Sequence, residues 1–315
     1  MAKLKVWIRV VRPKFWLAGI PSIILGAAIA WYCAKTFNLT YFLLTLFGII
    51  FAMVGCYTFN EYFDFRSRVD LVVKSEDVTP FSAGSRVLPE GLVKPSHVLK
   101  IGVVCWGFAF IIGVYLAYVR GILILALALA GFLAGAFYTA PPLKWAYRGL
   151  GEVFIGLTYG PLITLGSCYV QLPSLPLRLT LLSSLIPGIL IAAVIWINQF
   201  PDYYADKEVG KRNLVVRIGR EKSAKIYGLL LAAPYLLVVL GVLFRFFPVT
   251  ALLVLGTVPL AYKNIALTRK YYDKPRKLIP ALKGTVLLFV LTTLLLSAGF
   301  YFKGYVAALT SIKEW

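Results

Sequence analysis

Long uninterrupted runs of hydrophobic residues dominate the pattern of this chain. A membrane-spanning helix needs about 20 mostly apolar residues, and nine stretches of the 315-residue sequence meet that requirement. The predicted spans are residues 15–33, 40–59, 98–119, 121–139, 152–171, 180–199, 225–243, 248–267 and 284–302. Because the connections leave no room for a separate soluble domain, the pattern predicts one all-α domain over residues 1–315. We expect a polytopic membrane helical bundle of nine transmembrane helices, with cytoplasmic loops capping a central cavity.

The composition agrees with this interpretation and excludes several classes of protein. Hydrophobic residues make up 60% of the chain and charged residues only 15%, whereas a soluble domain is about a quarter charged. An ordinary soluble enzyme, a disordered chain and a disulfide scaffold are therefore excluded. The four cysteines, Cys33, Cys56, Cys105 and Cys168, lie in or beside apolar runs without metal-ligand spacing. The single histidine, His97, leaves little for a catalytic triad or a His-rich metal site.

Basic residues are distributed unevenly between the two sides of the predicted bundle. The formal net charge is +20, from 33 Lys and Arg against 13 Asp and Glu. If the nine spans alternate in direction, 27 of the 33 basic residues fall on the side of the N-terminus. By the positive-inside rule we expect an integral protein of the cell membrane, with a cytoplasmic N-terminus and an external C-terminus. The charge reflects this topology and the anionic lipid surface, and it indicates no nucleic-acid partner.

The N-terminus does not have the pattern of a cleavable signal. Residues 1–14 are basic, but the apolar run that follows is too long for a signal-peptide core and lacks a clear small-residue cleavage site. We therefore expect the first apolar run to remain as a membrane helix.

Acidic residues gather at the cytoplasmic ends of two predicted spans. The motifs consist of Asn60, Asp64 and Asp70 after the second span and of Asn198, Asp202 and Asp206 after the sixth. In each motif an aspartate follows the asparagine by four positions, which places both side chains on one face of a helix. Asp70 is six residues after Asp64, so it is expected beyond the helix end or after a bend.

Two carboxylate clusters at one membrane face indicate a site for a hard cation. Mg²⁺ typically takes one or two carboxylates and shares its other positions with substrate phosphates and water. Cations beside such a cluster suit a diphosphate group, and the same loops supply Arg66, Arg68, Lys144, Lys207, Lys211 and Arg212. The alternative interpretation is that the acids only pair with these loop cations at the membrane interface.

These residues resemble the two aspartate-rich motifs of the UbiA superfamily of intramembrane prenyltransferases. The first motif departs from the common form of that family, because Arg68 stands at its third acidic position and Asp70 follows two residues later. The spacing is similar to that of the 1,4-dihydroxy-2-naphthoate polyprenyltransferase branch, which belongs to menaquinone biosynthesis. Further stretches that fit are residues 12–13, 80–91, 138–144, 149–152 and 206–219.

The resemblance implies nine transmembrane helices and transfer of a prenyl chain from a prenyl diphosphate to an aromatic acceptor, with Mg²⁺ bound between the motifs and the diphosphate. In that branch the prenyl chain replaces a carboxyl group, which leaves as CO₂. The implied catalytic and metal-binding carboxylates are Asp64, Asp70, Asp202 and Asp206, with Asn60 and Asn198 as further metal ligands. The implied substrate-binding residues are Arg66, Arg68, Tyr138, Lys144, Lys207, Lys211 and Arg212.

Two other activities fit part of the pattern. Relatives in the same superfamily that add geranylgeranyl chains to a glycerol phosphate ether share the fold and the metal motifs. From a different class, a membrane transporter is an alternative, because related acidic motifs occur in two parts of the chain. Transporter sites usually lie near the bilayer midplane, whereas these motifs lie at the cytoplasmic ends of the predicted spans.

Three local features complete the prediction. The loop over residues 65–97 is longer than ordinary connections, and such loops are often active-site lids, so residues 80–88 are the predicted lid. Pro201 lies inside the second motif and is predicted to kink or restart the helix. Aromatic side chains near the motifs are candidates for stabilising a carbocation: Tyr57, Tyr62, Tyr138 and Trp196.

Overall fold

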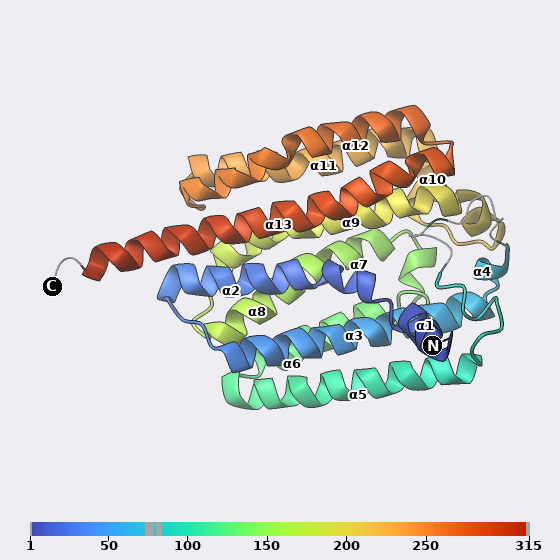
Figure 1. The fold of residues 1–315 in the computed structure, drawn as a ribbon, viewed down its shortest axis with the longest axis horizontal. Coiled ribbons are helices and arrows are strands. Elements are labelled where there is room, and N and C mark those ends of the chain that lie inside the picture. The colour runs from blue at the N-terminus through green and yellow to red at the C-terminus, as the bar shows by residue number, and fades with distance from the viewer. Residues whose placement is uncertain (1, 73–78, 80–83, 313–315) are drawn as a thin grey trace.

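A computed structural model describes residues 2–72, 79 and 84–312, and these residues form a helical bundle without strands (Figure 1). Side-chain positions are described for all of them except residues 2, 3, 70 and 305–312. The predicted all-α class is confirmed. The α-helices are α1 (Ala2–Val11), α2 (Ile20–Ala34), α3 (Leu39–Arg66), α4 (Val69–Val72), α5 (Pro95–Arg120), α6 (Leu123–Ala136), α7 (Gly151–Leu157), α8 (Ile163–Gln171), α9 (Leu177–Glu208), α10 (Leu214–Ile218), α11 (Arg220–Leu243), α12 (Val258–Tyr271) and α13 (Pro275–Ile312). Shorter helical turns are η1 (Pro13–Ala18), η2 (Trp145–Tyr147), η3 (Thr158–Leu162) and η4 (Val249–Thr257).

Within the described ranges, eight helical stretches are long and apolar enough to cross a membrane. They correspond to eight of the nine predicted spans. The other prediction, residues 121–139, corresponds to α6, whose 14 residues are fewer than the roughly 20 of a usual span. The count of nine membrane-spanning helices therefore stays a prediction. The predicted span 152–171 is built from α7, the π-helical turn η3 and α8.

Helix α9 lies at the centre of the main core. Its Ile186, Leu190, Ile197 and Phe200 are almost fully buried, and the same core continues into α2, α11 and α13. In a membrane, lipid tails are as apolar as leucine, so helices gain stability mainly from close packing. Helix α9 is 32 residues long. It therefore extends from this core to one end of the bundle, where its last turns contain the second acidic motif.

Small residues let the helices around α9 approach closely. An added Cβ at Gly160 of η3 would lie 2.5 Å from the Cα of Gly188 on α9, and one at Gly26 of α2 would lie 2.6 Å from the carbonyl oxygen of Thr164 on α8. Both distances are far below a normal carbon contact. The backbone crossings at Gly26 and Gly160 therefore require glycine, as expected of small residues at membrane helix interfaces.

Pro201 does not interrupt α9. The sequence predicts a kink or a restart at this residue, but the helix runs through both Pro187 and Pro201 and ends at Glu208. The predicted restart is wrong. Proline removes one backbone donor and crowds the preceding turn, yet Pro201 lies buried within a helix that continues past it. The continuous helix keeps the asparagine and both aspartates of the second motif in helical register.

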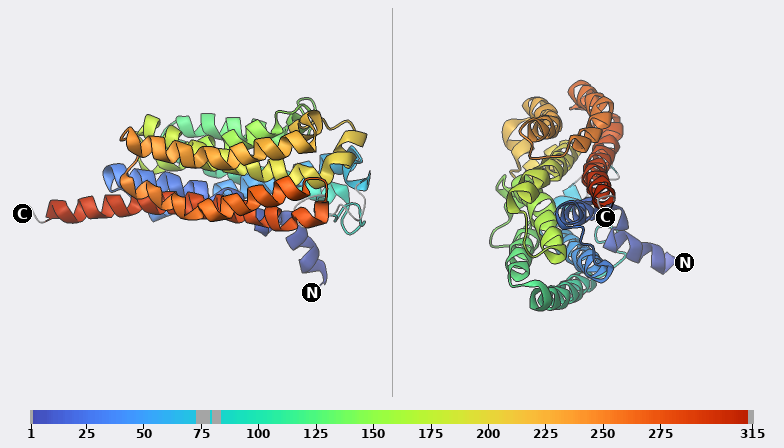
Figure 2. Two further views of the ribbon diagram at one scale, coloured as in Figure 1. Left: turned by 90° about the horizontal axis from the view of Figure 1, so that it is seen from above. Right: turned by 90° about the vertical axis from the view of Figure 1, so that its left-hand side faces the viewer.

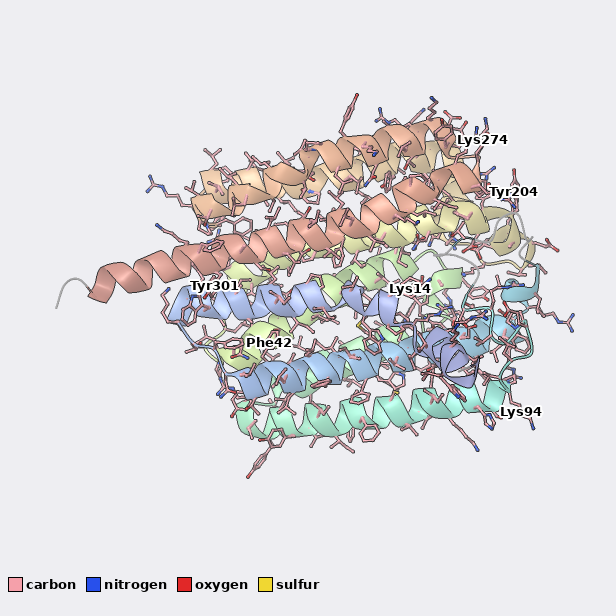
Figure 3. All side chains as sticks on the ribbon, in the orientation of Figure 1. Lys14, Phe42, Lys94, Tyr204, Lys274 and Tyr301 are labelled. Atoms are coloured by element: carbon pink, nitrogen blue, oxygen red, sulfur yellow. The ribbon has the colours of Figure 1, made fainter. Side chains whose placement is uncertain are left out.

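The two motif-bearing helices end at the same end of the bundle. Helix α3 is followed there by α4, and α9 is followed by α10 (Figure 1). Figure 3 shows Lys94, Tyr204 and Lys274 at this end, whereas Phe42 and Tyr301 lie toward the other. Helix α1 points away from the bundle in both views of Figure 2. Of the predicted lid, residues 80–83 lie outside the described residues, and residues 84–88 belong to a turn that precedes α5.

Candidate active site

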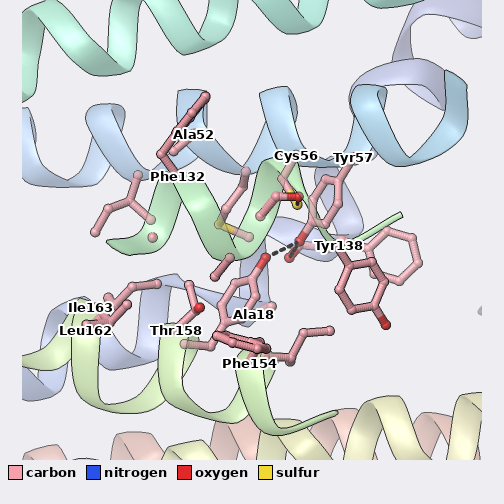
Figure 4. Close-up of a pocket in the computed structure, with 18 of the residues that line it drawn as sticks. Ala18, Ala52, Cys56, Tyr57, Phe132, Tyr138, Phe154, Thr158, Leu162 and Ile163 are labelled. Carbon is pink, nitrogen blue, oxygen red and sulfur yellow. Dashed lines mark hydrogen bonds between the residues drawn. The ribbon is translucent and has the colours of Figure 1, made fainter. Parts of the chain in front are cut away.

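A cavity of about 410 Å³ lies between α3, α5, α6, α9 and the stretch from α7 to α8. Its lining is polar near the motif-bearing ends of α3 and α9, and it becomes apolar toward the first turns of α3. Figure 4 shows its middle part, where Ala52 and Cys56 of α3 and Phe132 of α6 surround the space together with Ile163 of α8. The cavity therefore has one charged end and one hydrocarbon-like end.

Both acidic motifs meet at the polar end of this cavity. Asn60 and Asp64 line it from α3, and Asn198, Asp202 and Asp206 line it from α9. The spacing of four residues explains this arrangement, because such positions share one face of a helix. Five of the six predicted metal-ligand residues are thus brought together. The sixth, Asp70, has its backbone in α4, while its side chain lies outside the described part of the chain.

Two oxygen atoms of this cluster are buried and lack a hydrogen bond within the described part of the chain. Asp64 Oδ1 and Asn198 Oδ1 have no hydrogen-bond partner among the described residues. Asn60 differs, because its Oδ1 accepts a hydrogen bond from Thr139 Oγ1 at 3.1 Å. Buried oxygen atoms normally have a partner, and leaving one unpaired costs about 1–3 kcal/mol. Asp64 and Asn198 therefore present two hard donors that are suited to a cation or to a ligand that donates hydrogen bonds.

The protein does not form a complete metal cage by itself in the ranges described. No group of three His, Cys, Asp or Glu side chains there stands close enough together to hold a metal ion. Mg²⁺ usually takes only one or two carboxylates and completes its shell with substrate phosphates and water. The paired aspartates on α3 and α9 fit that mode of binding, in which the substrate supplies part of the coordination.

Lys211 is the predicted cation that reaches the cavity lining. The chain turns back after α9 at Gly210, which has a positive φ of 75°, and the Lys211 amide donates to the Asp206 carbonyl at 2.8 Å. This turn brings Lys211 Nζ to 3.4 Å from Asp206 Oδ1, with 16% of the lysine side chain exposed. Burial alone lowers the pKa of Lys211, but the carboxylates of Asp206 and Asp64 outweigh it and raise this pKa well above its usual value.

Asn213 holds the same turn in place. It is fully buried, and its Nδ2 donates to Asp206 Oδ2 at 2.7 Å. Its Oδ1 accepts from the Val216 amide at 2.8 Å and so caps α10. Glu152 of α7 accepts from the Leu214 amide at 2.9 Å. The loop that carries Lys211 is therefore fixed to both α9 and α7.

A second charged network, which the sequence does not predict, closes the other side of the polar end. Glu61 of α3 and Arg12 line the cavity, and their closest side-chain atoms are 2.7 Å apart. Glu61 also accepts hydrogen bonds from the Ser85 amide at 3.0 Å and from Ser85 Oγ at 2.6 Å. Only 3% of the Glu61 side chain is exposed. Glu61 itself could have been noticed in the sequence, because it directly follows Asn60 in the first motif. The partners of Glu61, however, are distant in sequence.

The network anchors the segment of residues 84–94 beside the cavity. Arg9 of α1 donates from Nη2 to the Ser85 carbonyl at 2.8 Å and pairs with Glu90 at 2.9 Å. Val87 and Leu88 of the segment are buried against Val10 and Val98. This 84–94 segment is thus held by α1, by α3 and by the first turn of α5.

The other predicted diphosphate-binding cations lie outside the cavity lining: Arg66, Arg68, Lys144, Lys207 and Arg212. Arg68 follows the end of α3 with a positive φ of 65° and an exposed side chain. Lys144 stands over the ring of Tyr147, 5.2 Å from its centroid. Contact between these cations and a substrate stays a prediction.

Aromatic side chains occupy the boundary between the polar and apolar parts of the cavity. Tyr57, Tyr138 and Tyr159 line it there, and the hydroxyls of Tyr57 and Tyr159 are 3.2 Å apart (dashed line in Figure 4). Two other predicted aromatics do not face the cavity. Trp196 is buried and donates to the Ser223 carbonyl at 3.0 Å, and Tyr62 is absent from the lining.

Comparison with known proteins places this architecture in a family. A model of the UbiA prenyltransferase family matches residues 19–289. The chain is 28% identical to a 1,4-dihydroxy-2-naphthoate octaprenyltransferase of Bacillus subtilis over 228 residues. These residues cover 72% of this chain and 70% of that protein. It is 27% identical to the Escherichia coli protein of the same name, with 98% of each chain covered.

Solved structures share the fold. A structure described as digeranylgeranylglyceryl phosphate synthase matches with a TM-score of 0.64 and 22% identity, over 96% of this chain and 99% of that one. A UbiA homologue from Archaeoglobus fulgidus bound to GPP and Mg²⁺ matches with a TM-score of 0.63 and 16% identity, over 93% and 99%. Because the family match extends over far more than half of its residues, this chain belongs to the UbiA prenyltransferase family and is a prenyltransferase that is integral to a membrane.

Proposed function

We propose that this protein transfers a polyprenyl chain from a prenyl diphosphate to 1,4-dihydroxy-2-naphthoate in menaquinone biosynthesis, with Mg²⁺ as cofactor. The observation that carries the proposal is one cavity that has acidic, amide and cationic groups at one end and apolar walls at the other. This polarity matches a donor with a charged diphosphate head and a hydrocarbon tail. The similarity to the naphthoate octaprenyltransferases of Bacillus subtilis and Escherichia coli supports this acceptor.

The residues at the polar end fit a magnesium ion. The buried, unsatisfied oxygens of Asp64 and Asn198 are hard donors of the kind that Mg²⁺ prefers. The residues that would hold the ion are Asn60, Asp64, Asn198, Asp202 and Asp206, together with Asp70. When bound, Mg²⁺ supplies Lewis-acid stabilisation of negative charge on the diphosphate oxygens.

Lys211 and Arg12 provide fixed positive charge beside the diphosphate. Both line the polar end, and both are already oriented by buried carboxylates, Lys211 by Asp206 and Arg12 by Glu61. Charge that is placed before the reaction stabilises a developing anion without further reorganisation. We assign to Lys211 a direct hydrogen bond to a diphosphate oxygen. Five further cations around the mouth of the site attract the anionic donor: Arg66, Arg68, Lys144, Lys207 and Arg212.

The chemistry consists of the exchange of one bond for another at C1 of the prenyl chain. The C1–oxygen bond breaks and its electron pair leaves on the diphosphate, while the ring carbon that bears the carboxyl group donates the pair for the new carbon–carbon bond. The bond from this ring carbon to the carboxyl group then breaks, its electron pair restores the aromatic ring, and the carboxylate leaves as CO₂. The allylic cation that forms must not meet water. The apolar walls exclude water, and the faces of Tyr57, Tyr138 and Tyr159 stabilise positive charge.

Charge asymmetry supports an orientation for this site. If α6 completes nine spans, the end of the bundle that bears the motifs lies on the side with 27 of the 33 basic residues. The positive-inside rule then places the site, the N-terminus and the 84–94 segment at the cytoplasmic face of the plasma membrane. The C-terminus lies outside.

The test is transfer by the purified protein in nanodiscs. Radiolabelled geranylgeranyl diphosphate is supplied with 1,4-dihydroxy-2-naphthoate or with geranylgeranylglyceryl phosphate, with and without Mg²⁺. Asp64→Ala and Asp202→Ala are compared with the control Asp273→Ala, an exposed aspartate outside the cavity lining. We expect a Mg²⁺-dependent prenylated naphthoquinol that both site variants lose and the control keeps. Product with the glycerol phosphate alone would refute the acceptor but keep the site.

A further inference from the structure

The apolar end of the cavity is closed by a floor of packed side chains. Leu116 of α5, Ile124 of α6 and Val170 of α8 line this end, with exposed fractions of only 4%, 7% and 2%. Behind them, Arg120 donates from Nε to the Val170 carbonyl at 2.7 Å. These three residues, called the floor below, join α5, α6 and α8 into one cluster. A chain that extends from the polar end meets this floor.

The distance between the two ends of the cavity can be estimated from the residues of α3 that line it. Leu44, which packs against the floor, and Asp64 both line the cavity on α3 and are twenty residues apart. At 1.5 Å per residue the separation along the helix is about 30 Å. If a diphosphate occupies roughly one turn of α3, about 25 Å remains for the hydrocarbon. An extended isoprene unit advances by roughly 5 Å, because it adds four chain bonds of ordinary carbon–carbon length.

We propose that the floor makes this enzyme selective for donors of about five isoprene units or fewer. This inference rests on the proposed function and narrows its substrate class. A geranylgeranyl chain, with four units, fits entirely between the polar end and the floor. An octaprenyl chain exceeds this length and must fold back or leave the cavity, so it binds in the site less well.

Gly131 of α6 provides a way to shorten the cavity. It lines the cavity, and an added Cβ there meets no atom within 4 Å, so a larger side chain projects into open space. The level of Gly131 along the cavity can be estimated from Gly135 of the same helix. An added Cβ at Gly135 would lie 3.3 Å from Cys56 Sγ of α3, so Gly135 and Cys56 are at the same level. Gly131 is one turn further toward the floor, which places it about 18 Å from the level of Asp64. A leucine at this position leaves room for about two isoprene units.

A matched control lies on the neighbouring helix. Gly107 of α5 also has no atom within 4 Å of an added Cβ, but it is exposed and does not line the cavity. Gly107→Leu therefore adds the same side chain to the outside of the bundle. Gly113 of α5 does line the cavity and has open space, so Gly113→Leu is a second blocking variant. Leu116→Ala lowers the floor.

The experiment compares geranyl, geranylgeranyl and octaprenyl diphosphates in nanodiscs with 1,4-dihydroxy-2-naphthoate and Mg²⁺. Product is measured for each donor, and in parallel each donor competes with radiolabelled geranyl diphosphate for binding. The competition assay needs no acceptor. If no product forms with any donor, the proposed transfer fails, while the binding ratios still test the floor.

We expect the wild type to bind octaprenyl diphosphate at least about tenfold more weakly than geranylgeranyl diphosphate, a ratio that corresponds to about 1.4 kcal/mol. Gly131→Leu should lower the ratio of geranylgeranyl to geranyl binding by a similar factor, and Gly113→Leu should lower it less. Leu116→Ala should raise the ratio of octaprenyl to geranylgeranyl binding. Equal binding of both long donors by the wild type, or an equal effect of Gly107→Leu and Gly131→Leu, would overturn the proposal.

Discussion

The replacement Glu61→Gln tests whether a buried charge holds the 84–94 segment beside the active site. The carboxylate accepts three hydrogen bonds, one from Arg12 Nη2 at 2.7 Å and two from Ser85 at 3.0 and 2.6 Å. A glutamine side chain has nearly the same shape, but it carries no charge and only one acceptor oxygen. Arg12 then loses its carboxylate partner, and at least one Ser85 donor loses its acceptor.

The magnitude follows from these contacts. A hydrogen bond to a charged group contributes about 1.5–3 kcal/mol, and Glu61 is almost completely shielded from solvent, with 3% of its side chain exposed. We therefore expect Glu61→Gln to lower the free energy of local opening of the segment by about 3 kcal/mol. At 1.4 kcal/mol per factor of ten, opening becomes more frequent on the order of a hundredfold.

Amide hydrogen exchange of peptides that cover residues 84–94 measures this opening directly. The control is Glu90→Gln, which removes a carboxylate from the same segment. Glu90 pairs with Arg9, but these side chains are 43% and 39% exposed, and exposed pairs contribute only about 0–1 kcal/mol. Its exchange should accelerate about fivefold at most. Equal acceleration in both variants, or none in Glu61→Gln, would refute the assignment of the anchor to Glu61.

Four further predictions concern the polar end of the cavity. Lys211→Met should raise the KM for the prenyl diphosphate by about tenfold or more, because it removes a charged hydrogen-bond donor from a buried site; steady-state kinetics measure this. Because carboxylates raise the pKa of Lys211, its charge persists until the pH passes through that raised value, so the wild-type KM should show no loss from this group between about pH 7 and about pH 9. Asn213→Ala removes the Asp206 hydrogen bond and the α10 cap, and should lower the thermal midpoint by roughly 5 °C in a thermal melt. Chelation by EDTA should abolish transfer while circular dichroism shows unchanged helix content, because apolar packing rather than metal holds the bundle together.

The apolar runs of the sequence predict the fold because each membrane helix satisfies its backbone hydrogen bonds internally. The motif residues are predictable for a similar reason, since the four-residue spacing of Asn60 and Asp64 places them on one face before any tertiary contact is known. The details of helix ends are less predictable. Pro201 suggests a break, but it lies buried within α9, which is continuous to Glu208.

Which cations reach the site depends on tertiary structure and not on local pattern. Arg68 and Lys211 both follow a motif-bearing helix. Arg68 faces solvent, whereas the turn at Gly210 and the contacts of Asn213 bring Lys211 back to Asp206. The pairing of Glu61 with Arg12 joins residues 49 positions apart. No helical or strand periodicity relates such distant positions, so sequence reasoning could not find this network.

The most direct test of the account is the position of the metal in a complex. The protein would be crystallised with Mn²⁺ in place of Mg²⁺ and with a geranylgeranyl thiodiphosphate that resists ionisation. We predict an anomalous peak at the polar end of the cavity, between Asp64 of α3 and the aspartates Asp202 and Asp206 of α9, with the hydrocarbon directed toward Leu116. A bound diphosphate without a metal at these carboxylates, or a metal peak elsewhere in the bundle, would contradict the proposed active site.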